Sequence, residues 1–333
     1  MGRGRVGLFE ADWIKREALR INRLLDLLHT LNLVVITKED LIRFRGAGYR
    51  QNILFGQEGH DLIGDMLLRK EPFMVSRLGA VELASLRFYV ENRGAAGKRG
   101  YSRKIRSTMV NNAGFFPADN GSLDAFAEMY LDRLQQADVM GVWFNQYEDV
   151  ICNGWCRDAK LVDLDCLEPF RFHNPWSARL AGRKVLVVHP FAESIRQQYT
   201  EKRRLLFAVP EVLPDFDLKT LAAVQSIAGS AVEFATWFDA YRHMCDEMAR
   251  MDFDVCLIGA GAYGLPLASF AKQLGKQAIH LGGVTQILFG IKGRRWEREY
   301  ADSTAQLFNE HWVRPLPSET PAHTARVDKG CYW

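Results

Sequence analysis

Three glycines at a fixed spacing follow an apolar run in the last third of the chain. Residues 254–258 read DVCLI, and Gly259, Gly261 and Gly264 come next in the pattern G-x-G-x-x-G, ahead of a helical pattern at 265–274. Gly259 permits a sharp strand-to-helix turn, Gly261 lets the backbone approach a phosphate, and Gly264 lets the helix pack on the strand. Since the first amides of such a helix carry partial positive charge, the loop predicts a diphosphate ligand.

The residues after this loop disfavour a dinucleotide. Such a site expects an acidic residue about 20 positions beyond the glycines, to hold the ribose hydroxyls. Here the next strand, at 277–281, carries His280 near its tip, followed by two glycines. A nicotinamide-dependent oxidoreductase and a purely structural turn remain the alternatives for this motif.

A second turn brings a cation and a carboxylate together. A short strand at 71–79 contains Arg77 and leads into a helical pattern that contains Glu82. A guanidinium can hold a diphosphate in a bidentate grip. A carboxylate can bind Mg²⁺ or Mn²⁺, or accept the proton of an attacking hydroxyl. The alternative is an Arg–Glu ion pair that stabilises the turn.

Two further groups of side chains follow strands. His189 lies near the end of the run at 183–191 and could contact a phosphate or a base. The basic segment at 292–296 follows the glycine-bearing strand and contains Lys292, Arg294, Arg295 and Trp296. Its cations could neutralise a departing diphosphate and its tryptophan could stack on a sugar or base, whereas a solvated run of charges is the alternative.

The elements that must position these residues alternate between strand and helix. Apolar runs predict strands at 71–79, 138–143, 183–191, 252–258 and 277–281, with a short strand near Val212. Helical patterns lie at 123–136, 195–204 and 218–249, the last interrupted near Gly229. This order predicts an α/β fold, with a Rossmann-like, largely parallel sheet and helices on both faces. Ligands of such sheets lie beyond the carboxyl ends of the strands, so these strand-end residues are expected to converge: Arg77, Gly79, Trp143, His189, Gly259 and His280.

The two ends of the chain differ from this central part. Apolar residues at 14–31 recur at helical spacing with arginines and lysines between them, which predicts an α-helical N-terminal extension at 1–65. Such a helix can touch a membrane surface, pack on its own domain or join a second subunit as a homodimer. We expect the catalytic domain at 66–313 and an extended, proline-rich strap at 314–333.

Composition excludes several classes of protein. The chain has 333 residues, 48% of them hydrophobic, and a net charge of +3, so no bulk electrostatic attraction to nucleic acid is implied. Its six cysteines lack regular spacing and indicate reduced thiols. Because no apolar run approaches the roughly 20 residues of a membrane span, we expect a cytoplasmic protein that could work at the inner face of the membrane.

At this point the motifs resemble a known family. Residues 77–82, RLGAVE, are similar to the Arg-Phe-Gly-Asp-Gly-Glu signature of the GT-D-type bacterial glycosyltransferases, and the glycine-rich turn with the strand at 277–281 resembles that family's second landmark. The resemblance implies a Rossmann-like fold and a nucleoside-diphosphate sugar as donor, most readily a UDP-sugar. It also implies a glycan or lipid-linked acceptor and a role in surface polysaccharide biosynthesis.

Two departures from the family pattern concern the metal. Ala80 stands where the family has its first carboxylate, and His280 stands where it has a strand-end aspartate. Glu82 is therefore the remaining candidate ligand for Mn²⁺ or Mg²⁺, or else a base. We assign catalysis to Arg77, Glu82 and Arg294, and nucleotide-sugar binding to Gly79, His189, Gly259, Gly261, Gly264, His280, Lys292, Arg295 and Trp296. A nucleotide-binding regulatory protein is the alternative outside the enzymes.

Overall fold

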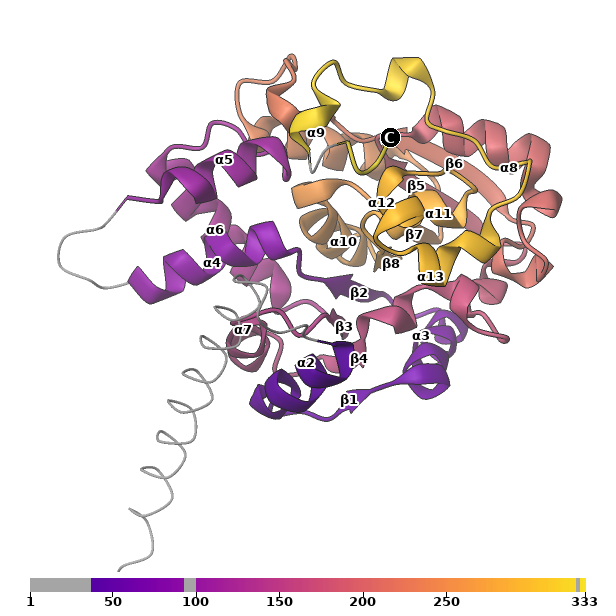
Figure 1. Cartoon of the computed structure of the whole chain (residues 1–333), viewed down its shortest axis with the longest axis horizontal. Coiled ribbons are helices and arrows are strands. Elements are labelled where there is room, and N and C mark those ends of the chain that lie inside the picture. Colours follow the sequence, from indigo (N-terminus) through magenta and orange to yellow (C-terminus); the bar gives the residue numbers. More distant parts are fainter. Residues whose placement is uncertain (1–36, 93–99, 328–329) are drawn as a thin grey trace, which may run out of the picture.

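The computed structural model describes residues 37–92, 100–327 and 330–333 (Figure 1). The strands are β1 (Ile53–Leu54), β2 (Phe73–Arg77), β3 (Val139–Val142), β4 (Lys160–Asp163), β5 (Lys184–His189), β6 (Asp217–Ala222), β7 (Val255–Ile258) and β8 (Gln277–His280). The helices are α2 (Lys38–Arg45), α3 (Gly56–Arg69), α4 (Ala80–Asn92), α5 (Arg103–Asn111), α6 (Asn120–Leu134), α7 (Glu148–Trp155), α8 (Ala192–Leu206), α9 (Trp237–Arg250), α10 (Gly264–Gln273), α11 (Val284–Leu288), α12 (Arg294–Arg298) and α13 (Ala301–Thr304).

The strands form one sheet in the order β1-β4-β3-β2-β8-β7-β5-β6, and every pair in it is parallel. Helices α4, α5, α6, α9 and α10 pack into the core on one face, and α3, α8 and α11 pack into the core on the other. The α/β, Rossmann-like fold with helices on both faces is therefore confirmed. In the part of the chain that the structure describes, no helix is long and apolar enough to span a membrane.

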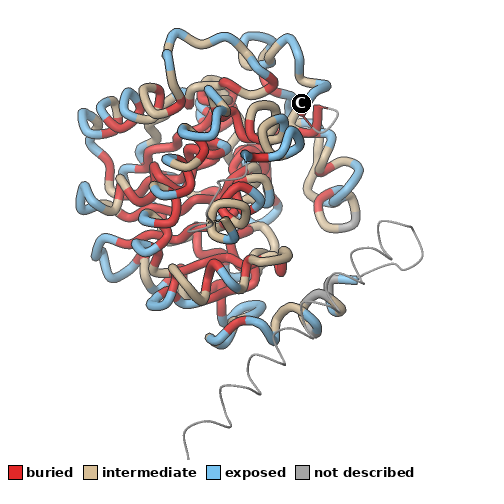
Figure 2. Tube along the Cα trace, turned by 90° about the vertical axis from the view of Figure 1, so that its left-hand side faces the viewer, coloured by how far each residue is buried: buried red, intermediate tan, exposed pale blue. Residues whose placement is uncertain are grey.

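The strands are apolar because each one supplies side chains to both cores. In β7, Val255 and Leu257 join one buried cluster, whereas Cys256 and Ile258 join the opposite one. This is the twofold alternation of a strand that is covered on both sides. The buried residues accordingly gather in the interior of the molecule, with exposed residues around them (Figure 2).

The order of the strands creates two places where the crossovers diverge. From β2 the chain continues to β3 on one side, while the other neighbour of β2 is β8. In the same way β5 leads to β6, while its other neighbour is β7. Crevices open at such switch points, at the carboxyl ends of the strands, and the ends of β2, β8, β7 and β5 are therefore the expected place for a ligand.

The helix predicted at 218–249 is wrong in its first half. Residues Asp217–Ala222 form β6, which pairs along its full length with β5, and α9 begins only at Trp237, after a capping box between Thr236 and Asp239. As an edge strand, β6 is only half-buried, so its apolar residues are too few to show a strand's alternation. The strand predicted near Val212 is also wrong, because Pro210–Val212 is a 3-10 helix.

The predicted boundaries near the two ends of the chain can be compared with the structure. The apolar pattern at 14–31 lies outside the described residues, and the boundary after residue 65 falls inside α3, whose Ile63 and Leu67 are fully buried. The division into an extension, a domain and a strap thus stays a prediction. The C-terminal segment includes the 3-10 turns Pro317–Glu319 and Thr324–Arg326 and passes alongside α8 (Figure 1, yellow).

A carboxylate ties this C-terminal segment to helix α8. Glu319 accepts hydrogen bonds from the backbone amides of Glu193, at 2.8 Å, and Ser194, at 3.3 Å, in the first turn of α8. The Ser194 hydroxyl also donates to Glu319. An acidic side chain is well placed at a helix N-terminus, where the free amides carry partial positive charge. The N-terminus of α8 is therefore already occupied from within the chain.

Candidate active site

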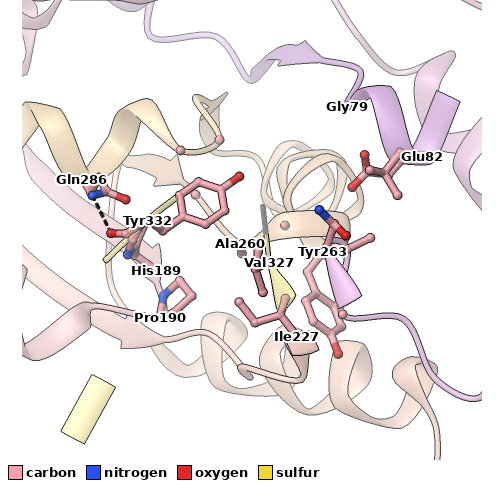
Figure 3. A pocket seen from close by; sticks show the side chains of 18 of the residues that line it. Gly79, Glu82, His189, Pro190, Ile227, Ala260, Tyr263, Gln286, Val327 and Tyr332 are labelled. Carbon is pink, nitrogen blue, oxygen red and sulfur yellow. Dashed lines mark hydrogen bonds between the residues drawn. The ribbon is translucent and has the colours of Figure 1, made fainter. Parts of the chain in front are cut away.

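A cavity of about 290 Å³ lies at the carboxyl ends of the central strands (Figure 3). All six strand-end residues that we expected to converge line it: Arg77, Gly79, Trp143, His189, Gly259 and His280. They come from β2, β3, β5, β7 and β8 or from the turns that follow these strands. The predicted convergence is confirmed, and the cavity occupies the switch points of the sheet.

Arg77 is the cation at the centre of this arrangement. Its guanidinium carbon lies 4.1 Å from the centre of the Trp143 ring, and its Nε is buried without a hydrogen-bond partner among the described residues. Burial lowers the pKa of Arg77, while the nearby charge of Glu82 opposes that shift. No ion pair joins Arg77 to the described residues, so the simple Arg–Glu pair is not what the structure shows. A desolvated cation without a partner is costly, and it suits an anionic ligand.

Glu82 lies in the first turn of α4 with its carboxylate folded back over Gly79. A Cβ atom on that glycine would lie 2.8 Å from the carboxyl carbon of Glu82, so a side chain at residue 79 would displace the carboxylate from this position. Burial raises the pKa of Glu82, while a backbone hydrogen bond and the charge of Arg77 lower it. The carboxylate lines the cavity (Figure 3), and a raised pKa makes it a better proton acceptor than an ordinary exposed glutamate.

The glycine-rich turn is held mainly by contacts within the protein. A Cβ on Gly259 would lie 2.5 Å from the carbonyl oxygen of Gly282, and one on Gly264 would lie 2.2 Å from Nε2 of His280. Gly261 has a φ of +52°, which favours glycine. The amides of Gly259 and Tyr263 donate to backbone carbonyls at 2.9 and 3.1 Å. The turn therefore exposes fewer free amides to a phosphate than its sequence predicts.

Two neutral histidines pack against this turn. The Phe191 amide donates to Nδ1 of His189 at 2.9 Å, which leaves the ring proton on Nε2, and burial lowers the pKa of His189 to about 3. Nδ1 of His280 lies 3.0 Å from Oγ of Ser76, and burial followed by the charge of Arg77 lowers its pKa to about 3. Both rings are thus neutral at pH 7 and can only offer hydrogen bonds, not charge, to a ligand.

Only some residues of the basic segment at 292–296 reach the cavity or its surroundings. Arg295 lines the cavity, where its Nη1 lies 3.2 Å from the Tyr332 hydroxyl and its Nε lies 3.6 Å from Glu299. Trp296 is buried and lines an adjoining, smaller hollow. Lys292 and the exposed Arg294 line neither space. The structure therefore brings Arg295 to the cavity and leaves Arg294, which we expected in catalysis, outside it.

The structure adds wall residues that sequence reasoning missed. They come from α6, the loop after β6, the glycine-rich turn, α11 and the C-terminal segment: Tyr130, Gln225, Ser226, Tyr263, Gln286 and Tyr332. Below the wall, Glu148 accepts from the Tyr49 hydroxyl and the Trp143 amide at 3.0 Å each. Burial raises the pKa of Glu148 to about 7. Its place at the start of α7, in the first helix after the strand that ends at Val142, was the available signal.

The described residues do not fit a metal held by carboxylates. No group of three or more histidine, cysteine, aspartate or glutamate side chains gathers there in a way that could hold an ion. Beside Glu82 stand Ala80, which has no donor, and the cation Arg77. We therefore assign no step to a protein-bound Mn²⁺ or Mg²⁺ at Glu82.

The fold is an α/β fold with a cavity at the carboxyl edge of a parallel sheet. Residues 171–288, which include His189, the glycine-rich turn and His280, match the family described as a GT-D fold-like domain. This match confirms the predicted resemblance to the GT-D-type family for that part of the chain, and it supports a glycosyltransferase in general. Arg77, Glu82 and Arg295 lie outside the matched segment, so their roles stay predictions.

Two solved structures are similar to the chain at low identity. One is described as a selenomethionine-substituted structure of domain of unknown function 1792, with 12% identity. The other is described as showing that this highly conserved domain has a distinct glycosyltransferase fold, with 14% identity. Each match covers 78% of this chain and 96% of the other at a TM-score of 0.35, a likeness too low to add to the assignment. No curated protein matches the sequence.

Proposed function

We propose that the protein transfers a sugar from a nucleoside-diphosphate donor, most readily a UDP-sugar, to a glycan or lipid-linked acceptor. The cellular setting that we propose is surface polysaccharide biosynthesis at the cytoplasmic face of the membrane. The proposal is supported by the GT-D fold-like domain and by a cavity that gathers cations, a carboxylate and aromatic rings at the switch points of the sheet.

The observation that carries the proposal is the state of Arg77. A guanidinium that is desolvated, stacked on Trp143 and without an ion pair in the described structure costs folding free energy. Such a cost is typical of a functional site, where a ligand supplies the missing partner. The diphosphate of a nucleotide sugar is a suitable partner because arginine binds phosphate oxygens in a planar, bidentate way.

In the proposed reaction an acceptor hydroxyl oxygen forms a bond to the anomeric carbon of the donor sugar. The bond between that carbon and the diphosphate oxygen breaks, and its electron pair stays on the departing nucleoside diphosphate. Arg77 and Arg295 stabilise the charge that develops there, in the manner of preorganised electrostatic donors. Glu82 accepts the proton of the attacking hydroxyl.

The test is a binding measurement on two arginine variants. Arg77→Met keeps an apolar stem against Trp143 and removes the charge, so we expect UDP affinity to fall at least tenfold while the melting temperature of the free protein stays the same or rises. The matched control is Arg203→Met, since Arg203 also stacks on an aromatic ring, 5.6 Å from the centre of Tyr199, but lies outside the cavity. Isothermal titration calorimetry with UDP and thermal melting measure both quantities.

Three outcomes would contradict the proposal. The first is unchanged UDP affinity in Arg77→Met. The second is stabilisation of the wild-type protein by NAD(H) and not by UDP, GDP or CMP, which would favour an oxidoreductase. The third is UDP binding without any turnover of UDP-sugars, which would favour a regulatory protein. Because the two arginines carry the charge in this proposal, EDTA should leave most of the turnover intact, and a complete loss that Mn²⁺ restores would overturn that assignment.

A further inference from the structure

One end of the cavity is lined by uncharged residues from three segments. They come from the turn after α5, from the loop after β6 and from the glycine-rich turn, and we call them the uncharged end: Gly114, Val224, Gln225, Ser226, Ile227 and Tyr263. The Ser226 hydroxyl donates to the Gly114 carbonyl at 2.6 Å and lies 3.3 Å from the Tyr263 hydroxyl. These contacts join the three segments, so the uncharged end is a fixed part of the wall.

The two arginines of the cavity lie near a different residue, Tyr332. Burial raises the pKa of the Tyr332 hydroxyl, and the charges of Arg295 and Arg77 oppose that shift, so both cations are close to this ring. Figure 3 shows Tyr332 and Tyr263 on different sides of the cavity. A diphosphate held by the arginines would therefore leave an uncharged part of the same ligand to occupy the uncharged end.

Within the uncharged end, the side-chain amide of Gln225 has an unused donor. Its Nε2 is buried without a hydrogen-bond partner in the described structure. The backbone on both sides is fixed, because the Val224 amide donates to the sulfur of Met244 at 3.4 Å and the Ser226 hydroxyl donates to Gly114. A buried donor without a partner costs free energy that a ligand can recover by supplying an acceptor. The ligand group that meets Gln225 therefore carries an acceptor, such as a carbonyl oxygen.

A pyrimidine base fits the uncharged end better than a sugar ring does. Val224 and Ile227 are apolar and Tyr263 contributes an aromatic ring, and such surfaces suit a flat heteroaromatic group. The six residues of this end include no carboxylate, the group that accepts several hydrogen bonds from sugar hydroxyls. Uracil has a carbonyl oxygen, O4, where cytosine has an amino group, so of these two bases uracil is the one that offers Gln225 an acceptor there.

We propose that the uncharged end is the nucleobase subsite of the donor and that Gln225 selects uracil. Nε2 of Gln225 donates to O4 of the base, and Oε1 accepts a hydrogen bond from the N–H group beside it. The inference rests on the proposed function, since it needs a nucleoside diphosphate in the cavity. It goes beyond that function by naming the residue that recognises the base and the atoms of the base that it recognises.

The experiment compares UDP with CDP, which differ only at the O4 edge of the base. Calorimetry on the full chain gives both affinities, and their ratio cancels any general effect of a substitution on the cavity. We test Gln225→Met, which keeps the length of the side chain and removes the amide, and Gln225→Glu, which replaces the donor with an acceptor. The matched control is Gln197→Met, because Gln197 is also half-buried but lies in α8, outside the cavity.

We expect the wild-type protein and Gln197→Met to bind UDP at least about tenfold more tightly than CDP, since CDP leaves the buried donor unpaired. Gln225→Met should bind the two nucleotides within about threefold of each other, through weaker binding of UDP. Gln225→Glu should favour CDP, whose amino group donates to the new carboxylate. Thermal melting shows whether each variant is folded.

Equal binding of UDP and CDP by the wild-type protein would overturn the inference, and so would an unchanged ratio in folded Gln225→Met. Unchanged UDP affinity in Gln225→Met together with weaker binding of UDP-glucose would also overturn it, because the uncharged end would then hold the sugar of the donor. A wild-type protein that binds neither nucleotide would overturn the proposed function, and this inference with it.

Discussion

The turn that follows β7 and the turn that follows β2 line the same cavity, and they differ in what their residues contact. In the first turn, Gly259 and Gly264 make room for a backbone carbonyl and for the His280 ring. In the second, Arg77 and Glu82 place charged groups at the cavity. The spacing of the glycines after β7 thus reflects close packing of the backbone. The turn after β2 supplies the charged groups on which the proposed chemistry depends.

The largest expected effect concerns Glu82. If it accepts the proton of the acceptor, Glu82→Gln preserves its shape and UDP affinity but lowers turnover by roughly 10²–10⁴-fold. The test measures turnover of a UDP-sugar, UDP affinity by calorimetry and the melting temperature on one preparation of the variant. An active but less stable variant would show that Glu82 has a structural role and would contradict its assignment as the proton acceptor.

The next largest effect on turnover is expected from one of the two neighbouring arginines of α12. Arg295 borders the cavity whereas Arg294 is exposed, so Arg295→Ala should lower turnover by about 10²–10³-fold, as is usual for one lost electrostatic donor, and Arg294→Ala should change it less than twofold. Equal losses in the two variants, measured at saturating donor, would be inconsistent with this division of the basic segment.

A substitution in the glycine-rich turn should change the unfolding free energy more than UDP affinity. In Gly264→Ala the new methyl group meets the buried His280 ring, and overpacking of this kind costs about 1–3 kcal/mol of unfolding free energy. Gly154→Ala is the control, because Gly154 lies in α7 with nothing within 4 Å of the new atom, and it should be neutral or stabilising by up to about 1 kcal/mol. Urea unfolding compares them, and loss of UDP affinity in fully folded Gly264→Ala would restore the phosphate role of the turn.

The smallest expected effect is a pH dependence of the stability that the two buried histidines of the cavity contribute. Burial lowers the folded-state pKa of His189 and of His280 from 6.5 to about 3. The unfolded chain therefore binds protons first, so the stability that these rings contribute is present above pH 6.5 and is lost as the pH falls toward 3. Between pH 7 and pH 6 the loss should be on the order of 0.5–1 kcal/mol per histidine.

Amide hydrogen exchange can locate this loss. Amides of β8 and α10 should exchange faster at pH 6 than at pH 7 once the intrinsic rates are corrected. On the α4 side burial raises the pKa of Glu82, so the stability that Glu82 contributes is lost as the pH rises from its ordinary pKa of 4.5 toward the raised one. Exchange that changes equally on both sides would contradict the assignment of neutral histidines to the glycine-rich turn.

Much of the fold could be predicted because strands buried on both faces are apolar runs that end at turns. β2, β3, β5, β7 and β8 all show this pattern, and the sheet rule then brought their ends together. β6 was missed because an edge strand carries no such run. Within the site, Arg77 and His189 were predictable from their strands. Tyr332 and Gln225 were not predictable, because packing between distant segments brings them to the cavity and no motif near them in the sequence indicates this.

The central pair of strands has a consequence for the order of assembly. β2 and β8 lie side by side in the sheet, and Ser76 and His280, which are 204 positions apart in the sequence, meet across that seam. Contacts between such distant segments form late, since the intervening chain must first be brought together. Arg77 on one side of the seam and the glycine-rich turn on the other therefore become a single cavity only when both halves of the sheet have joined. Ligand binding at this cavity would report on completed folding of the whole sheet.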